Sequence, residues 1–412
     1  MDLLSLDSEL VWHPFTPTPP LGPRQCLVRA EGEWVFDSNG RRYFDGTSSW
    51  WCQIHGHCNP ELVRALTQQA SELDHVLFSP HTHKPAVELA ELLIEVLGPP
   101  FSRVFYSDNG STAVETALKM CWQYWKNLGK TRTTLASLEG AYHGDTLGAV
   151  SLGGVEEFHG TFQRGEKIRL PIPVNDEAVE KGISLLRCHR DTLAALFIEA
   201  LIQGGNGMRI YPEEGLETLT KEAQRLSIPV VFDEVFTGFG RTGKMFAFQH
   251  IEARPDIICL AKGLTSGMLP LSATVVKKEI FDTFSSGRTF FHGHTFTGNP
   301  IGCAVAKRSL QLFQENRTLD SNLRLSEVMR VAQKRFSSLK GVRNARTLGV
   351  VWAIDLDTTG NELGWEIASR LWDRGIWLRP LGNVLYVIPP YCTTPEILET
   401  CFATLFEEVA KL

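Results

Sequence analysis

The sequence has no long apolar segment and no excess of positive charge. No run of about 18 apolar residues occurs, so no transmembrane helix is predicted. The N-terminal segment 1–7 is acidic and lacks the basic and apolar regions of a signal peptide. Lysine and arginine number 41 against 47 aspartates and glutamates, which gives a net charge of −6. This balance argues against a nucleic-acid-binding protein and against binding to an anionic membrane surface.

The nine cysteines do not form a recognisable framework. Their number is odd and no C-x-x-C occurs, so neither a disulfide scaffold nor a zinc ribbon is predicted. The densest group of metal-binding residue types is Cys52, His55, His57 and Cys58, but its spacing does not match a zinc site, and no metal is predicted. Because thiols persist in reducing compartments, a cytoplasmic protein is expected.

The pattern of the chain favours two domains. Its 412 residues are too many for one simple core. Predicted strands alternate with helical patterns from about residue 103, at Arg103–Ser107, Thr133–Leu138, Leu193–Glu199, Val230–Glu234 and Ile257–Ala261. This alternation is typical of a mostly parallel α/β sheet. We predict a large α/β domain at residues 49–304 and a smaller α+β domain at residues 305–412, to which an N-terminal segment, residues 1–48, contributes a β-hairpin.

Two buried-strand patterns each lead to one charged residue, Asp233 in one and Lys262 in the other. Their continuous apolar runs fit strands covered on both faces, and ligands bind beyond the carboxyl ends of such strands. A poorly solvated lysine there is easier to keep neutral and nucleophilic. The pair suggests a Schiff base between Lys262 and pyridoxal 5'-phosphate (PLP), with Asp233 on the pyridinium nitrogen. The alternative is an ordinary sheet whose strands end in two solvated charges.

Other residues fit contacts to the same cofactor. Gly110 and Ser111 open a predicted helix, whose N-terminal amides are a natural phosphate site, although Asn109 or Ser111 could simply cap it. Tyr142 lies on a glycine-flanked loop and can stack on a planar ring. Glu199 ends a strand, where it can hydrogen-bond near the ring or cap the turn that follows.

The segment Gly238–Lys244 matches both G-x-G-x-x-G and G-x-x-x-x-G-K. A P-loop nucleotide-binding protein is therefore an alternative from a different class. Met245 stands where a P-loop needs serine or threonine, and the residues after it are a poor long helix. We instead interpret Arg241 as a guanidinium for a substrate carboxylate.

These segments together resemble the class III PLP-dependent aminotransferases of fold type I over nearly the whole chain. The strongest matches are Val231–Gly243, Ala261–Leu264 and Gly293–Pro300. The resemblance implies that Lys262 binds PLP covalently and moves a proton, while Asp233 holds the ring nitrogen. It further implies cofactor contacts from Gly110, Ser111, Tyr142 and Glu199, and from Thr295 of a partner subunit. A homodimer with sites at the subunit interface and small-molecule substrates is expected.

Residues expected to contact substrate resemble the biotin-synthesis branch of this class. The resemblance implies a pocket lined by Trp50 and Trp51, with carboxylates bound by Arg241 and Arg379. It implies an 8-amino-7-oxononanoate acceptor and an S-adenosylmethionine donor. The chain has two departures from this branch, Phe15 in place of a tyrosine and His294 in place of a proline. Because of these two departures, lysine is a second candidate for the amino donor. The alternative function within the class is a transaminase for ω-amino acids.

Overall fold

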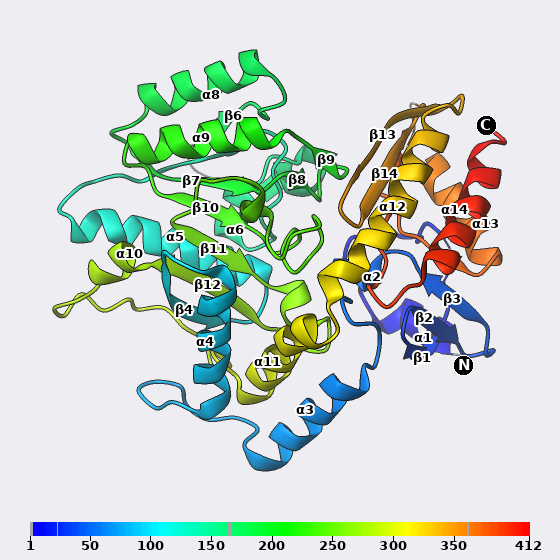
Figure 1. Cartoon of the computed structure of the whole chain (residues 1–412), viewed down its shortest axis with the longest axis horizontal. Coiled ribbons are helices and arrows are strands. Elements are labelled where there is room, and N and C mark those ends of the chain that lie inside the picture. Colours follow the sequence, from blue (N-terminus) through cyan, green and yellow to red (C-terminus); the bar gives the residue numbers. More distant parts are fainter. Residues whose placement is uncertain (1–2, 23, 163–166, 359, 361) are drawn as a thin grey trace. The chain divides into compact units, whose positions relative to one another are not determined.

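The computed structural model describes residues 3–22, 24–162, 167–358, 360 and 362–412 (Figure 1). The chain forms two compact units. One unit comprises the described residues up to Asn59 together with Asp320–Leu412, and the other is Pro60–Leu319. The sequence predicted domain boundaries after residues 48 and 304. This division into compact units does not test those boundaries, which stay a prediction.

The larger unit is built on a seven-stranded sheet (Figure 1). The strand order is β4 (Phe101–Ser107), β12 (Ser272–Lys277), β11 (Ile257–Leu260), β10 (Val230–Asp233), β7 (Leu193–Glu199), β5 (Thr134–Leu138) and β6 (Lys167–Leu170). Strand β12 runs antiparallel to both of its neighbours, whereas β11, β10, β7, β5 and β6 pair in parallel. The predicted α/β class with a mostly parallel sheet is confirmed.

The five strands predicted from the sequence are present, with ends shifted by at most a few residues. The prediction did not include β6 or β12. Strand β6 alternates lysine and arginine with apolar residues at the edge of the sheet, so it lacks the continuous apolar run of a central strand. Strand β12 is buried along nearly its whole length but contains small and polar residues, which weaken the same signal.

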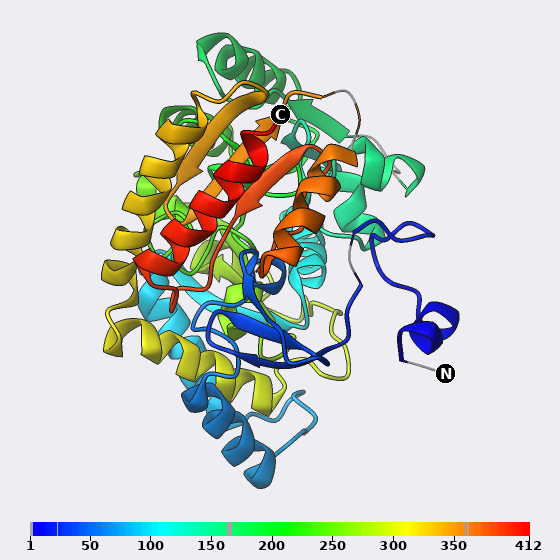
Figure 2. The ribbon, with the colours of Figure 1, turned by 90° about the vertical axis from the view of Figure 1, so that its right-hand side faces the viewer.

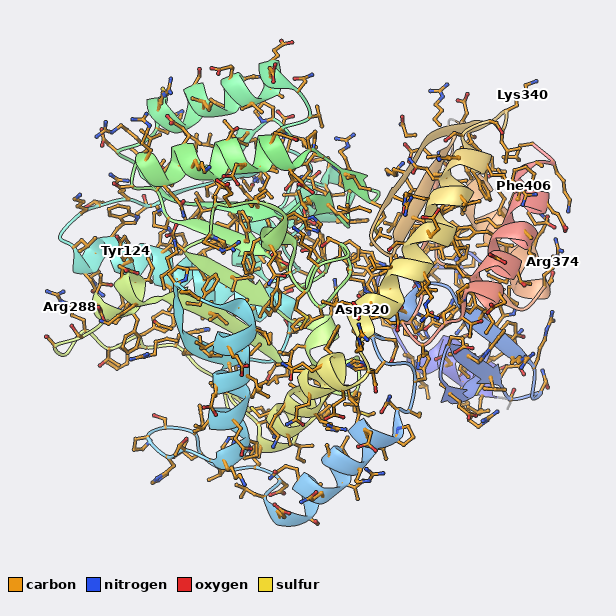
Figure 3. The ribbon with its side chains drawn as sticks, viewed as in Figure 1. Tyr124, Arg288, Asp320, Lys340, Arg374 and Phe406 are labelled. Carbon is orange, nitrogen blue, oxygen red and sulfur yellow. The ribbon has the colours of Figure 1, made fainter. Side chains whose placement is uncertain are left out.

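The larger unit also contains nine α-helices in its described residues. They are α3 (Pro60–Glu72), α4 (Lys84–Leu97), α5 (Gly110–Asn127), α6 (Leu147–Leu152), α7 (Glu156–His159), α8 (Asp176–Cys188), α9 (Glu213–Arg225), α10 (Lys278–Asp282) and α11 (Pro300–Glu315). Helix α5 packs along β7, β11 and β12, with Tyr124 near its C-terminal end (Figure 3). Trp125 is buried there and donates to the carbonyl of Ala194 at 2.8 Å, so its indole N–H is satisfied. This packing holds the first turn of α5 beside the carboxyl ends of the strands.

The smaller unit has two sheets. One contains β1 (Leu27–Glu31), β2 (Trp34–Asp37), β3 (Arg42–Asp45) and β15 (Ile376–Trp377), and the other contains β13 (Val342–Leu348), β14 (Val351–Leu356) and β16 (Val384–Val387). The pairing of β3 with β15 is parallel and joins the two ends of the chain in one sheet. The β-hairpin predicted in the N-terminal segment is present as β2 and β3, which pair antiparallel. Strand β1 precedes it, and Gly32 adopts a φ of 58° where the chain turns between β1 and β2.

The helices of the smaller unit are α1 (Leu3–Leu10), a short turn labelled α2 (Ser48–Trp51), α12 (Thr318–Phe336), α13 (Glu362–Asp373) and α14 (Pro395–Val409). Helices α12 and α14 lie side by side (Figure 2), joined by edge-on ring contacts among Phe336, Trp352 and Phe402. Among the described residues, no helix is both long and apolar enough to span a membrane.

Candidate active site

The parallel strands deliver three predicted site residues to one edge of the sheet. Glu199 ends β7 and Asp233 ends β10, and the two residues are direct neighbours in the strand register. Lys262 follows β11 and opens a short 3-10 helix, η3 (Lys262–Thr265), with a φ of 44°. A left-handed conformation is uncommon for a non-glycine residue and is concentrated at functional sites.

Asp233 is held in place by a buried histidine. Its Oδ2 lies 2.8 Å from Nδ1 of His143, and its Oδ1 accepts from the N–H of Val235 at 3.1 Å. Both side chains are buried. His143 was not predicted as a site residue, although it adjoins Tyr142. The histidine fixes the direction of the carboxylate, which is what an acid that must face one ring nitrogen requires.

A second network holds Tyr142. Its hydroxyl donates to Asp145 at 2.6 Å, and its ring stacks on His159 at 5.3 Å between centroids. The Tyr142 N–H donates to Glu199 at 2.9 Å. Because His159 covers one face of the ring, a planar ligand can stack only on the opposite face. Neither Asp145 nor His159 was predicted from the sequence.

Electrostatics separate the roles of the two strand-end carboxyl groups. Burial and the neighbouring Asp233 raise the pKa of Glu199 well above its ordinary value, and the charge of Lys262 opposes this rise. Two carboxylates this close cannot both keep their charge in a buried site. The raised pKa favours the neutral form of Glu199 beside Asp233.

The first turn of α5 carries backbone N–H groups of the kind that bind an anion. The predicted cap is present, since the side chain of Asn109 accepts from the N–H of Thr112 at 3.1 Å. This cap uses neither the N–H of Gly110 nor that of Ser111. At Gly110 an added Cβ would lie 2.6 Å from a methyl group of Val235, so only glycine fits. Capping and phosphate binding are thus compatible at this helix terminus.

The donor set matches PLP. The amine of Lys262 suits the carbonyl carbon of that cofactor, and the aspartate held by a histidine suits its ring nitrogen. The tyrosine ring, covered on one face, suits the face of the cofactor ring, and the helix N-terminus suits its phosphate. The described residues contain no group of three or more histidine, cysteine, aspartate or glutamate side chains placed to hold a metal ion.

The segment that carries His294 and Thr295 is anchored at its C-terminal end. Buried His83, the N-cap of α4, donates from Nε2 to the carbonyl of Gly298 at 2.7 Å, and Asn299 caps α11. The imidazole of His294 lies 3.4 Å from the carboxylate of Asp108, which precedes the first turn of α5. Thr295 is exposed in the single chain. Its contribution to the site of a partner subunit stays a prediction.

The loop Gly238–Lys244 is not a P-loop. The next regular element is the four-residue 3-10 helix η2 (Ala247–His250) rather than a long helix, so the nucleotide-binding alternative is wrong. Glu234 fixes the end of the loop by accepting from two backbone N–H groups of η2, at 2.6 and 2.8 Å. Arg241 is fully buried. The contact predicted between Arg241 and a substrate carboxylate stays a prediction.

Three predicted substrate residues come together within the smaller unit. The Phe15 and Trp50 rings meet edge-on at 5.7 Å, and the guanidinium of Arg379 lies 4.8 Å from the centre of the Trp50 ring. Arg379 also donates to the carbonyl of Phe15 at 3.3 Å. Trp51 instead packs into the core, against Tyr386. The cluster of Phe15, Trp50 and Arg379 combines an apolar wall with a cation, which suits a long substrate that ends in a carboxylate.

The two tryptophans lie on a left-handed turn. Ser48, Ser49, Trp50 and Trp51 have φ values of 49°, 44°, 71° and 72°. A left-handed helical conformation costs about 1–2 kcal/mol per non-glycine residue, so the surrounding structure must stabilise this turn. Part of that support comes from Ser48, whose hydroxyl donates to the carbonyl of Ile388 at 2.7 Å.

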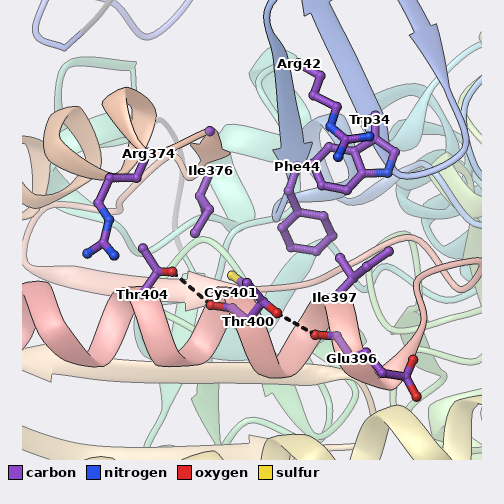
Figure 4. Close-up of a pocket in the computed structure, with 11 residues that line it drawn as sticks. Trp34, Arg42, Phe44, Arg374, Ile376, Glu396, Ile397, Thr400, Cys401 and Thr404 are labelled. Atoms are coloured by element: carbon purple, nitrogen blue, oxygen red, sulfur yellow. Dashed lines mark hydrogen bonds between the residues drawn. The ribbon is translucent and has the colours of Figure 1, made fainter.

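A separate cavity of about 420 Å³ lies against α14 in the smaller unit (Figure 4). The two arginines that line it, Arg42 and Arg374, already have partners. Arg374 binds Glu407 and Glu408, and the guanidinium of Arg42 lies 4.4 Å from the centre of the Trp34 ring. None of the predicted site residues lines this cavity.

Curated relatives match the chain along its whole length. The adenosylmethionine-8-amino-7-oxononanoate aminotransferase of Synechococcus elongatus is 41% identical, over 96% of this chain and 97% of its own. The protein of the same name from Helicobacter pylori is 34% identical, over 100% of this chain and 98% of its own.

Solved structures and a family pattern agree with these relatives. The adenosylmethionine-8-amino-7-oxononanoate aminotransferase of Methanocaldococcus jannaschii has a TM-score of 0.96 at 32% identity, covering 99% of this chain and 98% of its own. An omega transaminase from Pseudomonas jessenii has a TM-score of 0.94 at 27% identity, covering 100% and 99%. The family described as Aminotransferase class-III matches residues 21–409. The chain therefore belongs to the class III aminotransferases, which are PLP-dependent enzymes of fold type I.

Proposed function

We propose that the enzyme aminates 8-amino-7-oxononanoate to 7,8-diaminononanoate in biotin synthesis, as a homodimer, with S-adenosylmethionine as amino donor. The donor gives up its α-amino group and leaves as the corresponding keto acid, and the acceptor exchanges its ketone oxygen for the amine. The names of the relatives support this substrate pair. The observation in the chain itself that carries the proposal is the cluster of Phe15, Trp50 and Arg379, which offers a guanidinium beside an apolar wall.

Each site residue has a distinct task in this proposal. Bound PLP supplies an electron-accepting ring. Lys262 holds the cofactor and carries a proton to and from the substrate carbon. Asp233, oriented by His143, keeps the ring nitrogen protonated. Tyr142 covers one face of the ring and excludes water from it. Arg379 binds the carboxylate of the acceptor in this arrangement.

The direct test is product formation. The purified protein loaded with PLP is incubated with 8-amino-7-oxononanoate and either S-adenosylmethionine or lysine, and 7,8-diaminononanoate is quantified by mass spectrometry. We expect product with S-adenosylmethionine. Product with lysine alone would correct the donor. Efficient turnover of ω-amino acids with no diaminononanoate from either donor would overturn the proposal.

Arg379→Lys tests the carboxylate contact. Lysine keeps the charge but loses the planar fork that can bind a carboxylate through two N–H groups and lie over Trp50. A hydrogen bond to a charged group contributes about 1.5–3 kcal/mol, so KM for 8-amino-7-oxononanoate should rise by about 10- to 100-fold. Steady-state kinetics with the acceptor varied give this number, and Arg374→Lys, whose guanidinium binds Glu407 and Glu408, is the matched control.

His143→Leu tests the support of Asp233. The variant removes the Nδ1–H that binds Asp233 and leaves that carboxylate with less support in a buried site. We expect kcat to fall by about 10- to 100-fold. His143→Asn can present its amide where the histidine has Nδ1, so it should recover most of the loss. Equal kcat values for leucine and wild type would contradict this positioning role.

A further inference from the structure

Asp45, at the end of β3, is a fully buried carboxylate that the proposed chemistry does not use. Its Oδ2 accepts from the hydroxyl of Ser49 at 2.7 Å and lies 2.9 Å from Nε2 of His57. Its Oδ1 lies 3.2 Å from both the N–H and the hydroxyl of Thr47. Three of these four contacts come from the left-handed turn or the residue just before it. Asp45 is therefore bonded directly to the segment that carries Trp50.

His57 places its imidazole against this carboxylate. In the described part of the chain it is the one basic side chain within ion-pair distance of Asp45. Its own backbone is fixed, because its N–H and carbonyl pair with Gly32 at 2.7 and 3.1 Å. Burial opposes ionisation of Asp45, but the hydrogen bonds from His57 and then from Ser49 hold its pKa below the ordinary value. The carboxylate thus stays charged and binds its donors strongly.

The group is not a nucleophilic triad. In such a triad the serine donates to one imidazole nitrogen while the aspartate binds the other. Here the hydroxyl of Ser49 lies 3.4 Å from Nε2 of His57 and only 2.7 Å from Asp45. The serine and the histidine bind the same carboxylate oxygen. This arrangement ties the turn to the sheet and does not activate the hydroxyl.

We infer that Asp45, with Ser49 and His57, positions Trp50 for substrate and so determines the affinity of the enzyme for its acceptor. This inference rests on the proposed function, in which Trp50 and Arg379 contact the acceptor. Four consecutive non-glycine residues with positive φ do not hold that conformation unaided. The Asp45 carboxylate bonds to the centre of the turn, one residue from the ring that Phe15 and Arg379 contact. Asp45 is a positioning residue, because it acts through Trp50.

The test compares Asp45→Asn with Asp37→Asn. Asp37 is a matched control because it is also buried in this sheet and also accepts from a hydroxyl, that of Tyr43 at 2.8 Å, but it does not contact the turn. In Asp45→Asn we expect KM for 8-amino-7-oxononanoate to rise about tenfold or more, with kcat and bound PLP within about threefold of wild type. Asp37→Asn should leave KM within about twofold.

A second substitution separates positioning from general stability. Glycine adopts a positive φ without strain, so Asp45→Asn combined with Ser49→Gly should recover a large part of the lost affinity. A structural role alone predicts no such recovery. An unchanged KM in Asp45→Asn, or an equal rise in Asp37→Asn, overturns the inference. If Asp45→Asn does not fold, Ser49→Ala, which removes only the hydroxyl, is expected to raise KM in the same direction.

Hydrogen–deuterium exchange tests the inference without turnover. In Ser49→Ala, faster exchange than in wild type should be confined to the peptide covering residues 47–53, because this variant breaks only the bond to that turn. Unchanged exchange there would contradict the inference. If the wild-type protein makes no diaminononanoate, the proposed function fails, while the exchange result still decides whether Asp45 holds the turn.

Discussion

Lys262→Ala is expected to reduce transamination by at least about 10³-fold, because the variant loses both the covalent attachment of PLP and the group that moves the proton. Lys262 lies two residues after the end of the buried strand β11, at the edge of the sheet that also carries Asp233. We expect the visible absorption of the purified protein to be lost as well. Borohydride reduction followed by peptide mass spectrometry should place the cofactor on Lys262 in the wild type.

Lys244→Ala is the matched control for this lysine. Lys244 is exposed, donates to the carbonyl of Gln249 at 2.9 Å, and is the residue that a P-loop would need. Its loss should leave turnover and visible absorption within about twofold of the wild type, as for most exposed substitutions away from a site. If Lys262→Ala keeps the absorption, or if Lys244→Ala loses it, the assignment of Lys262 is wrong.

Asp233→Asn should lower kcat by about 10²- to 10³-fold while the protein still binds PLP. Removing one preorganised electrostatic contact to developing charge typically costs this much. The asparagine has almost the same volume and can still contact His143 and the N–H of Val235, so the fold around it should persist. The measurement is kcat in steady state, together with the visible spectrum and the amount of PLP bound per chain.

The charge-conserving variant Asp233→Glu sharpens this prediction. It retains the carboxylate but moves it by one methylene group in a site where the aspartate is buried against β7 and β11. We expect an activity between that of the wild type and that of Asp233→Asn. Near-normal turnover in Asp233→Asn would mean that the ring nitrogen does not depend on this acid, and the role given to Asp233 would be wrong.

Local patterns were sufficient for the architecture and for the residues at the sheet edge. The runs that end at Asp233 and Lys262 are continuous and apolar, and the parallel strands they form are buried throughout. Because parallel strands align their carboxyl ends, two residues far apart in the chain could be placed at the same edge before the fold was known. Strand β12 was not predicted, because its burial depends on the strands that pair with it on both sides, β11 and β4, rather than on its own composition.

The supporting residues depend on contacts between distant segments. His143 reaches Asp233 across 90 positions, and Arg379 meets Phe15 across 364. Neither histidine nor arginine carries a local signal for such a partner. Likewise, both Trp50 and Trp51 were predicted to line the substrate pocket, and no local signal distinguished the two. Packing in the folded unit assigns Trp51 to the core and leaves Trp50 more exposed.

The amino-acid pattern alone thus predicted a class of fold, a cofactor and the two residues expected to act most directly on it, because hydrophobic periodicity and strand direction are properties of short segments. Tertiary structure alone decided which side chains orient Asp233, which face of Tyr142 is open and how the turn of Trp50 is held against its conformational preference. These are orientations, and an orientation is determined by contacts that close only when distant parts of the chain pack together.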